Sequence, residues 1–283
     1  QYIGNGMGIV STLNGGGQNV NGGTGITTVM FDGEQTVDNE GVAILITMNG
    51  GSQSIGGRDG YGMGIVSTMS GGLQRISYFG SGIVVNMSGG GQNIASRCSG
   101  TVSNMNGGGQ NIASGGSGTV STMNGGEQEI RDGGAGTVSA LNGGRQIISS
   151  GGTSLDTVLN SSGTVYQNSG GIISNITYSG GVQVIDNITA GYDNMTLGSG
   201  GTNVTMGVIS GAQMSGTILN NGGAQLVLAG GTALATEVSG GMMQLASGGI
   251  VSGLTMTGGS LELSAVSGGS FAINGTLSAT NAS

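Results

Sequence analysis

The chain has 283 residues, of which 67 are glycine, and it contains no proline, histidine or tryptophan. Only 6% of the residues are charged and the net charge is −8, so the basic surface required for binding nucleic acid or anionic lipid is missing. Apolar residues still make up 35% and recur in register, which excludes a collagen helix and favours an ordered chain over a disordered linker.

Residues 1–88 repeat loosely. Four glutamines of this segment align with Gln92 of the next one, and the steps between them are 17, 18, 21 and 18 residues. The four are Gln18, Gln35, Gln53 and Gln74. We expect irregular turns here, with a small bulge around Tyr78 and Phe79. No apolar run of membrane-spanning length and no signal-peptide pattern is present, so we expect a piece of a longer secreted or surface protein.

Residues 89–263 repeat regularly. Three consecutive units read GGGQNIASRCSGTVSNMN, GGGQNIASGGSGTVSTMN and GGEQEIRDGGAGTVSALN, and from residue 150 the step lengthens to 19 residues. A fixed period near 20 residues is typical of stacked repeats, in which each unit buries its apolar residues only against its neighbours. Residues 264–283 lose the pattern and are a final turn or the start of another region.

Each unit holds two short β-favouring runs, Gln-x-Ile and Thr-Val-Ser-x-Met, separated by glycine-rich segments. Aligning the units gives three apolar columns: Ile94, Ile112, Ile130 and Ile148; Val102, Val120 and Val138; Met105, Met123, Leu141 and Leu159. Glycine pairs such as Gly107 and Gly108 suit sharp corners with positive φ. The sequence therefore predicts one continuous all-β solenoid, a right-handed parallel β-helix of about 14 turns built from 18–19-residue repeats.

The units SGGTSLDTVLNSSGTVYQN and SGGIISNITYSGGVQVIDN resemble the repeats of self-associating autotransporter adhesins of the AIDA and TibA type. The 18-residue units look closest to TibA. This resemblance implies a passenger domain at the bacterial cell surface or outer membrane, or secreted after processing. It also implies adhesion to a host-cell receptor or glycan, contact with identical passengers on neighbouring cells, autoaggregation, biofilm formation and a part in virulence. The shorter period, Cys98 and the Met242–Met243 pair depart from the family pattern.

Members of this family are O-glycosylated on repeat serines by a heptosyltransferase before export. The resemblance therefore implies covalent heptose on serines that project from the glycine-rich corners between strands. The matching serines are Ser96, Ser114, Ser117, Ser149, Ser150, Ser169, Ser179, Ser199, Ser239 and Ser247. A serine is also an ordinary small polar turn former, and this structural explanation stays open at each position.

Residues able to do chemistry are scarce. Without histidine or lysine the usual general bases are absent, one cysteine excludes an internal disulfide, and no aspartate series for calcium recurs. Solvated charge explains the acidic groups at residues 32–40 and 127–132. We expect no enzyme activity, no catalytic residue, no metal and no cofactor apart from the sugars.

Two other functions are open to a β-solenoid, ice binding and action on polysaccharides. Ice binding would use a flat threonine face, but Thr101, Thr119 and Thr137 stack without a partner column two residues on. Polysaccharide cleavage would need a carboxylate constellation on one turn. A glutamine column formed by Gln92, Gln110, Gln128 and Gln146 is expected to be a structural amide ladder, with a contact face between two solenoids as the lesser alternative.

Overall fold

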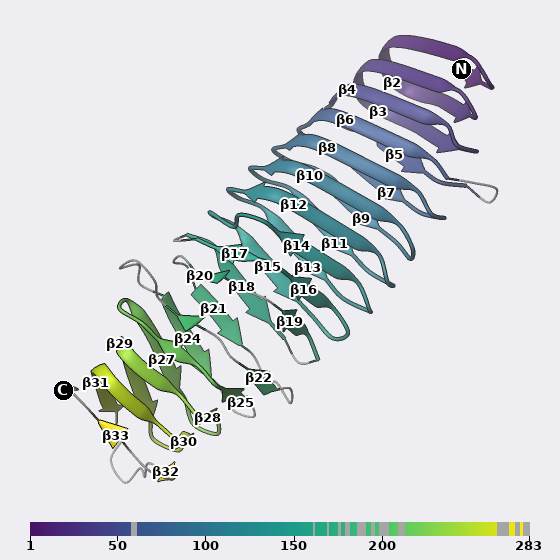
Figure 1. Ribbon diagram of the computed structural model, residues 1–283. Coiled ribbons are helices and arrows are strands. Elements are labelled where there is room, and N and C mark those ends of the chain that lie inside the picture. The colour runs from purple at the N-terminus through teal and green to yellow at the C-terminus, as the bar shows by residue number, and fades with distance from the viewer. Residues whose placement is uncertain are drawn as a thin grey trace. The chain divides into compact units, whose positions relative to one another are not determined.

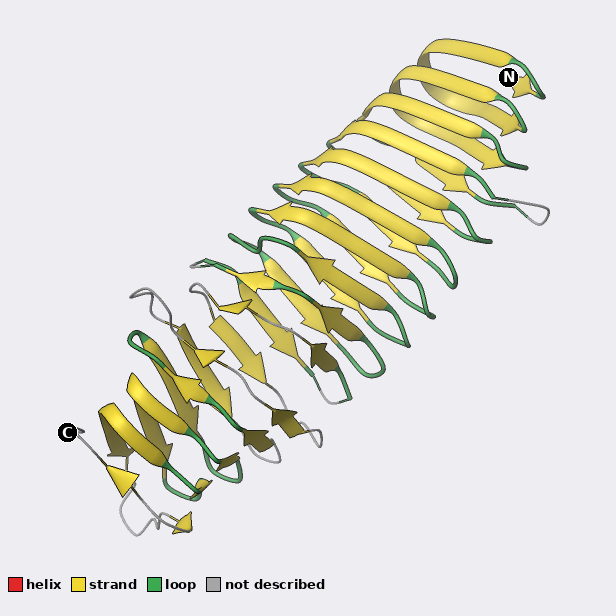
Figure 2. Ribbon diagram, viewed as in Figure 1, coloured by secondary structure: helices red, strands yellow, loops and turns green. Residues whose placement is uncertain are grey.

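The computed structural model is an all-β solenoid whose paired strands are all parallel. It describes residues 1–57, 61–160, 162–168, 170–174, 177–178, 182–185, 191–193, 196–197, 204–208, 213–264, 272–274 and 278–279. About 12 turns are present, close to the predicted 14, and no helix occurs in these ranges (Figure 2). The described residues thus offer no helix long and apolar enough to cross a membrane.

Two compact units divide the chain: residues 1–146 with 151–155, and residues 147–150 with 156–283. The strands of the first unit are β1 (Tyr2–Ile3), β2 (Met7–Asn21), β3 (Thr24–Asp38), β4 (Val42–Met48), β5 (Ser52–Ile55), β6 (Met63–Met69), β7 (Leu73–Ile76), β8 (Ser81–Met87), β9 (Gly91–Ile94), β10 (Ser99–Met105), β11 (Gly109–Ile112), β12 (Ser117–Met123), β13 (Glu127–Ile130), β14 (Ala135–Val138) and β16 (Thr153–Leu155). Strand β15 (Arg145–Ile148) contains residues of both units.

The strands of the second unit are β17 (Val158–Leu159), β18 (Thr164–Gln167), β19 (Ile172–Ser174), β20 (Thr177–Tyr178), β21 (Val182–Ile185), β22 (Gly191–Asp193), β23 (Thr196–Leu197), β24 (Val204–Val208), β25 (Gln213–Ser215), β26 (Ile218–Leu219), β27 (Gly223–Val227), β28 (Thr232–Leu234), β29 (Glu237–Ala246), β30 (Ile250–Ser252), β31 (Thr255–Ser264), β32 (Ala272–Asn274) and β33 (Ser278–Ala279).

One turn of the first unit consists of a long strand and a short strand, as in β10 and β11, and successive turns lie side by side (Figure 1). In β10, Gly100, Val102 and Met105 are buried, whereas Ser103 and Asn104 in succession are not. Alternation in a straight strand has a period of two, so this phase shift marks a bend. Inward columns therefore arise from three segments of each turn.

The three predicted apolar columns form the core. Strands β10 and β12 pair Val102 with Val120 and Met105 with Met123, and β11 pairs Ile112 with Ile94 of β9 across the preceding turn. Every member of the three columns is at most 2% exposed. Burying one such side chain contributes about 1.5–3 kcal/mol, so stacking identical turns supplies the main stabilisation.

The glycine pair between long and short strands is required for two different reasons. Gly108 has φ +77°, a left-handed conformation in which other residues are strained. Gly107 has no positive φ, but a Cβ there would lie 2.5 Å from the carbonyl oxygen of Ser88 in the preceding turn. The expectation of positive φ thus holds for Gly108 alone, whereas Gly107 is needed for the close approach of the chain.

Tyr78 and Phe79 form a corner rather than a bulge. Four residues separate β7 from β8, as between β9 and β10, and β7 pairs with β9 without a register shift. Register shifts occur instead between β2 and β3, near Leu13 and Asn14.

Candidate functional site

The glutamine column lies inside the first unit. Gln18, Gln35, Gln53, Gln74, Gln92, Gln110, Gln128 and Gln146 are all at most 1% exposed. Each amide nitrogen from Gln35 onward donates to Oε1 of the preceding glutamine at 2.6–2.7 Å. The structural ladder is confirmed. The alternative of a glutamine contact face is wrong, because these side chains point into the core.

Glycine carbonyls use the second amide hydrogen of several ladder members. Nε2 of Gln92 donates to the Gly82 carbonyl at 3.2 Å, and Nε2 of Gln110 donates to the Gly100 carbonyl at 3.3 Å. A Cβ at Gly100 would lie 2.6 Å from Oε1 of Gln92 and 2.3 Å from Cδ1 of Ile94. A side chain at Gly100 would therefore crowd the ladder and the neighbouring isoleucine unless they shifted. Ser154 takes the place of this glycine beside Gly136, and its hydroxyl donates to Oε1 of Gln146 at 2.9 Å.

The outward face of the long strands changes character along the first unit. Parallel pairing stacks five isoleucines in one column, followed by three threonines and a leucine: Ile9, Ile26, Ile44, Ile65, Ile83, Thr101, Thr119, Thr137 and Leu155. Ile9 is 63% exposed, and its neighbour Met7 is 70% exposed. The early turns thus present apolar side chains, and only three threonines follow them.

Asparagine ladders run along the exposed edges of the same unit. Nδ2 of Asn104 donates to Oδ1 of Asn86, and the side chains of Asn106, Asn124 and Asn142 are linked in the same way, all at 3.0 Å. These rows of exposed amides span two turns in one case and three in the other. Such rows can make many equivalent weak polar contacts with a repetitive partner.

The serines predicted to carry sugars fall into three groups. Ser96, Ser114, Ser150 and Ser247 lie in corners, and Ser149 immediately precedes one. Ser117 begins β12 and Ser239 lies in β29, so neither is a loop residue, although both side chains are exposed. Ser169, Ser179 and Ser199 lie outside the described residues.

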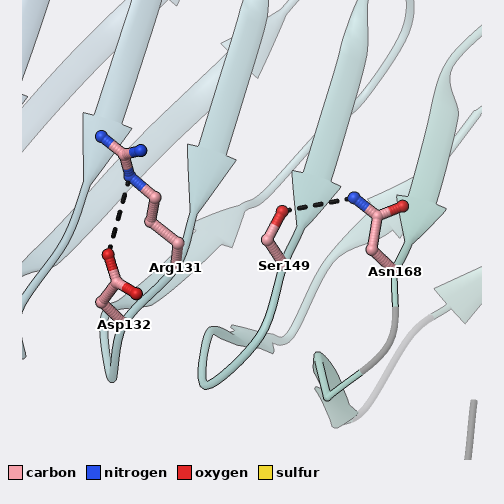
Figure 3. Close-up of polar contacts among 4 residues, drawn as sticks. All are labelled: Arg131, Asp132, Ser149 and Asn168. Carbon is pink, nitrogen blue, oxygen red and sulfur yellow. Dashed lines mark hydrogen bonds and ion pairs between the residues drawn. The ribbon is translucent and has the colours of Figure 1, made fainter.

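Hydrogen bonding distinguishes some of these serines. Oγ of Ser149 accepts a hydrogen bond from Nδ2 of Asn168 at 3.2 Å (Figure 3), and Oγ of Ser239 donates to Oε1 of Glu237 at 3.0 Å. Ser114 is exposed and has φ +54°, which places it at the tip of its corner.

The acidic residues are dispersed over the surface. Oε2 of Glu127 accepts a hydrogen bond from Nε of Arg145 at 2.5 Å, Oε1 of Glu34 accepts one from Ser54, and Asp132 lies 3.9 Å from Nε of Arg131 (Figure 3). Among the described residues, no group of three or more His, Cys, Asp or Glu side chains could hold a metal ion.

Cys98 is a free thiol in a buried position. It occupies the corner site held by Gly116 one turn later, and it is 3% exposed. Burial raises the pKa of the Cys98 thiol, and hydrogen bonds from the backbone of Phe79 and Gly80 partly oppose this shift. Cys98 is therefore an unpaired cysteine in the corner between β9 and β10.

Comparison with known proteins gives one informative result. No protein-family model matches the chain, and no curated protein matches it. Among solved structures, the chain is similar to the TibC-catalysed hyper-glycosylated TibA55-350 fragment, with a TM-score of 0.75 and 28% sequence identity. The match covers 98% of this chain and 100% of the fragment. The chain thus has a TibA-like β-solenoid.

Proposed function

We propose that this chain is a non-enzymatic adhesive passenger of a bacterial autotransporter, displayed at the cell surface or released from it. The observation that carries the proposal is the similarity to the TibA fragment over almost the whole of both chains. A relation of this extent concerns the repeat architecture and the surface that it presents, rather than one local motif.

The surface supports an adhesive role. Rows of asparagines span two or three turns, and the Ile-to-Thr column runs from β2 to β16, so a partner with its own repeats meets similar groups at successive turns. Each contact is weak, and linking many of them raises the overall strength by orders of magnitude. The partners we propose are an identical passenger on a neighbouring cell and a host-cell receptor or glycan, with autoaggregation and biofilm formation as the result.

Glycosylation is part of the proposal. The TibA fragment was hyper-glycosylated by TibC, and this chain presents exposed corner serines that a heptosyltransferase could modify before export. We place the sugars on Ser96, Ser114 and Ser150, because these serines are exposed and lie within corners. Ser117 and Ser239 provide a comparison, since they are exposed but lie in strands.

The test is clustering of beads coated with the chain, made with and without a co-expressed TibC-type heptosyltransferase, together with intact-mass measurement. We expect the beads to cluster and the mass to rise in steps of one heptose. Replacing Ser96, Ser114 and Ser150 by alanine should lower the number of heptoses seen in the mass. Replacing Ser117 and Ser239 by alanine should leave that number unchanged. Beads that stay dispersed in both preparations contradict the self-adhesive role, and an unchanged mass contradicts heptosylation.

A further inference from the structure

Two successive corners of the first unit, after β7 and after β9, differ from the corners that follow them. The third residue of the corners after β11, β13 and β15 is a glycine with positive φ: Gly115, Gly133 or Gly151. Phe79 stands at this place after β7, with φ +67°, and Arg97 stands there after β9, with φ +59°. A bulky residue in this conformation is strained, and such strain is retained where the side chain has a use.

The side chains of Phe79 and Arg97, from these two corners, form an exposed cluster with that of Tyr61, which precedes β6. The ring of Tyr61 lies 5.7 Å from that of Phe79, centroid to centroid, and the Arg97 guanidinium carbon lies 5.6 Å from the centre of the Phe79 ring. Tyr61 is 63% exposed and Phe79 is 47% exposed. The chain has only nine Phe and Tyr residues, so two exposed rings in contact are a local concentration of aromatic surface.

A groove adjoins the cluster. It has a volume of about 490 Å³ and runs over successive turns, lined among others by Arg75, Asn93, Ala95, Asn111, Glu129 and Arg131. Ala95 of this groove is two residues from Arg97 in the same corner. Nδ2 of Asn111 donates to Oδ1 of Asn93 at 3.0 Å, which leaves further donor and acceptor capacity on both amides.

This region has a small excess of positive charge, because Arg75, Arg97 and Arg131 outnumber Glu129 and Asp132. Arg75 and Arg97 are exposed, and neither forms an ion pair with any of the residues that the structure describes. The chain as a whole carries −8. Guanidinium groups bind carboxylates through paired hydrogen bonds, so two unpaired arginines beside a groove favour an anionic ligand.

We propose that the cluster of Tyr61, Phe79 and Arg97, together with the adjoining groove, binds an acidic polysaccharide. An aromatic ring offers an apolar face to the C–H groups of a pyranose, the asparagine amides match sugar hydroxyls, and the arginines match uronate carboxylates. An extended glycan also fits a groove that crosses several turns about 4.8 Å apart. The inference rests on the proposed adhesive function and names the class of its host-side ligand.

The test uses the chain made without a heptosyltransferase, because Ser114 lines the groove, and compares its binding to oligogalacturonate, to neutral oligogalactose and to polyglutamate. We expect oligogalacturonate to bind most tightly. The variant Phe79→Gly with Arg97→Gly should weaken this binding about tenfold or more, which corresponds to about 1.4 kcal/mol. This variant restores the glycine found at later corners, so its melting temperature should not fall. The matched control, Phe31→Ser with Arg145→Gln, removes an exposed ring and an arginine elsewhere and should bind normally.

Several results would overturn the inference: no preference for oligogalacturonate over the neutral oligomer, equal binding of polyglutamate, or full binding by the double-glycine variant. Bead clustering measured on the same samples separates this inference from the proposed function. Clustering without uronate binding rejects the glycan site alone. Uronate binding without clustering supports the site and rejects adhesion between identical chains.

Discussion

Replacing Gln92 by leucine tests the interior ladder. Gln92 donates to Oε1 of Gln74 at 2.6 Å and to the Gly82 carbonyl at 3.2 Å, and its own Oε1 accepts from Gln110 at 2.7 Å. Gln92→Leu keeps the volume but leaves the Gln74 oxygen and one Gln110 N–H without these partners. Each buried unpaired group costs about 1–3 kcal/mol, or about 2–6 kcal/mol for two. Burial of the leucine offsets about 1–2 kcal/mol, which leaves a net loss of about 2–3 kcal/mol at the centre of both ranges and at most about 5 kcal/mol.

A double variant gives a sharper expectation. In the variant Gln92→Leu with Gln110→Leu, Oε1 of Gln74 and one N–H of Gln128 lose their partners. Two buried groups are therefore left unpaired, as in the single variant. The two leucines together offset about 2–4 kcal/mol, so the double variant should cost no more than one single variant and much less than the sum of two.

The assay is urea unfolding followed by circular dichroism, with native-state hydrogen exchange of β7, β9 and β11 to localise the effect. The control is Asn124→Ala, which removes hydrogen bonds of an exposed ladder and should change stability by no more than about 0.5 kcal/mol. Single variants as stable as the control, or a double variant that costs the sum of the singles, would refute a cooperative buried ladder.

Three further predictions concern the first unit. Gly108→Ala should cost about 1–3 kcal/mol because of its φ of +77°, whereas Gly109→Ala, whose added Cβ would contact only a carbonyl oxygen at 3.8 Å, should cost less than half of that; urea midpoints decide this. The Cys98 thiol should react slowly with a maleimide in the native state and rapidly in urea, and fast native labelling would contradict its burial. Its raised pKa favours the folded state below the ordinary thiol pKa, so this contribution to stability should fade as pH rises through the folded pKa. Deleting residues 107–124 should leave a folded chain one turn shorter, because Gln92 and Gln128 then meet in register; loss of the β-sheet circular dichroism signal would contradict this.

Much of the fold could be predicted because the interior repeats at a fixed step. Ile94 and Ile112, or Met105 and Met123, occupy the same place in successive units, and parallel in-register pairing is the arrangement that stacks them. Their burial follows from hydrophobicity alone. The glutamine ladder could be expected from the same register, since an amide both donates and accepts.

The direction of polar side chains was harder to predict. A glutamine two residues before a buried isoleucine has the same strand parity, and this parity places Gln110 with Ile112 in the interior. Applied to the outward positions, the same parity would have found the column that begins with Ile9 and Ile26. The bend at Ser103 could not be seen in the same way, because it breaks the alternation on which the argument depends.

The candidate surface was only partly predictable. Ser114 and Ser117 are three residues apart in a serine- and glycine-rich segment, yet one lies in a corner and the other begins a strand. Composition does not distinguish them. The replacement of two glycines by Arg97 and Cys98 was visible in the repeat, but the contact of Arg97 with Phe79 depends on corners that are stacked one turn apart.

The most direct test of the adhesive role uses non-aggregating bacteria that display the chain. Cells carrying it in one colour are mixed with cells of a second colour that carry either the same chain or none, and mixed clusters are counted by microscopy. The account predicts two-colour clusters only when both populations display the chain. Dispersed cells in both mixtures, or clusters that form equally well with bare cells, would contradict adhesion between identical passengers.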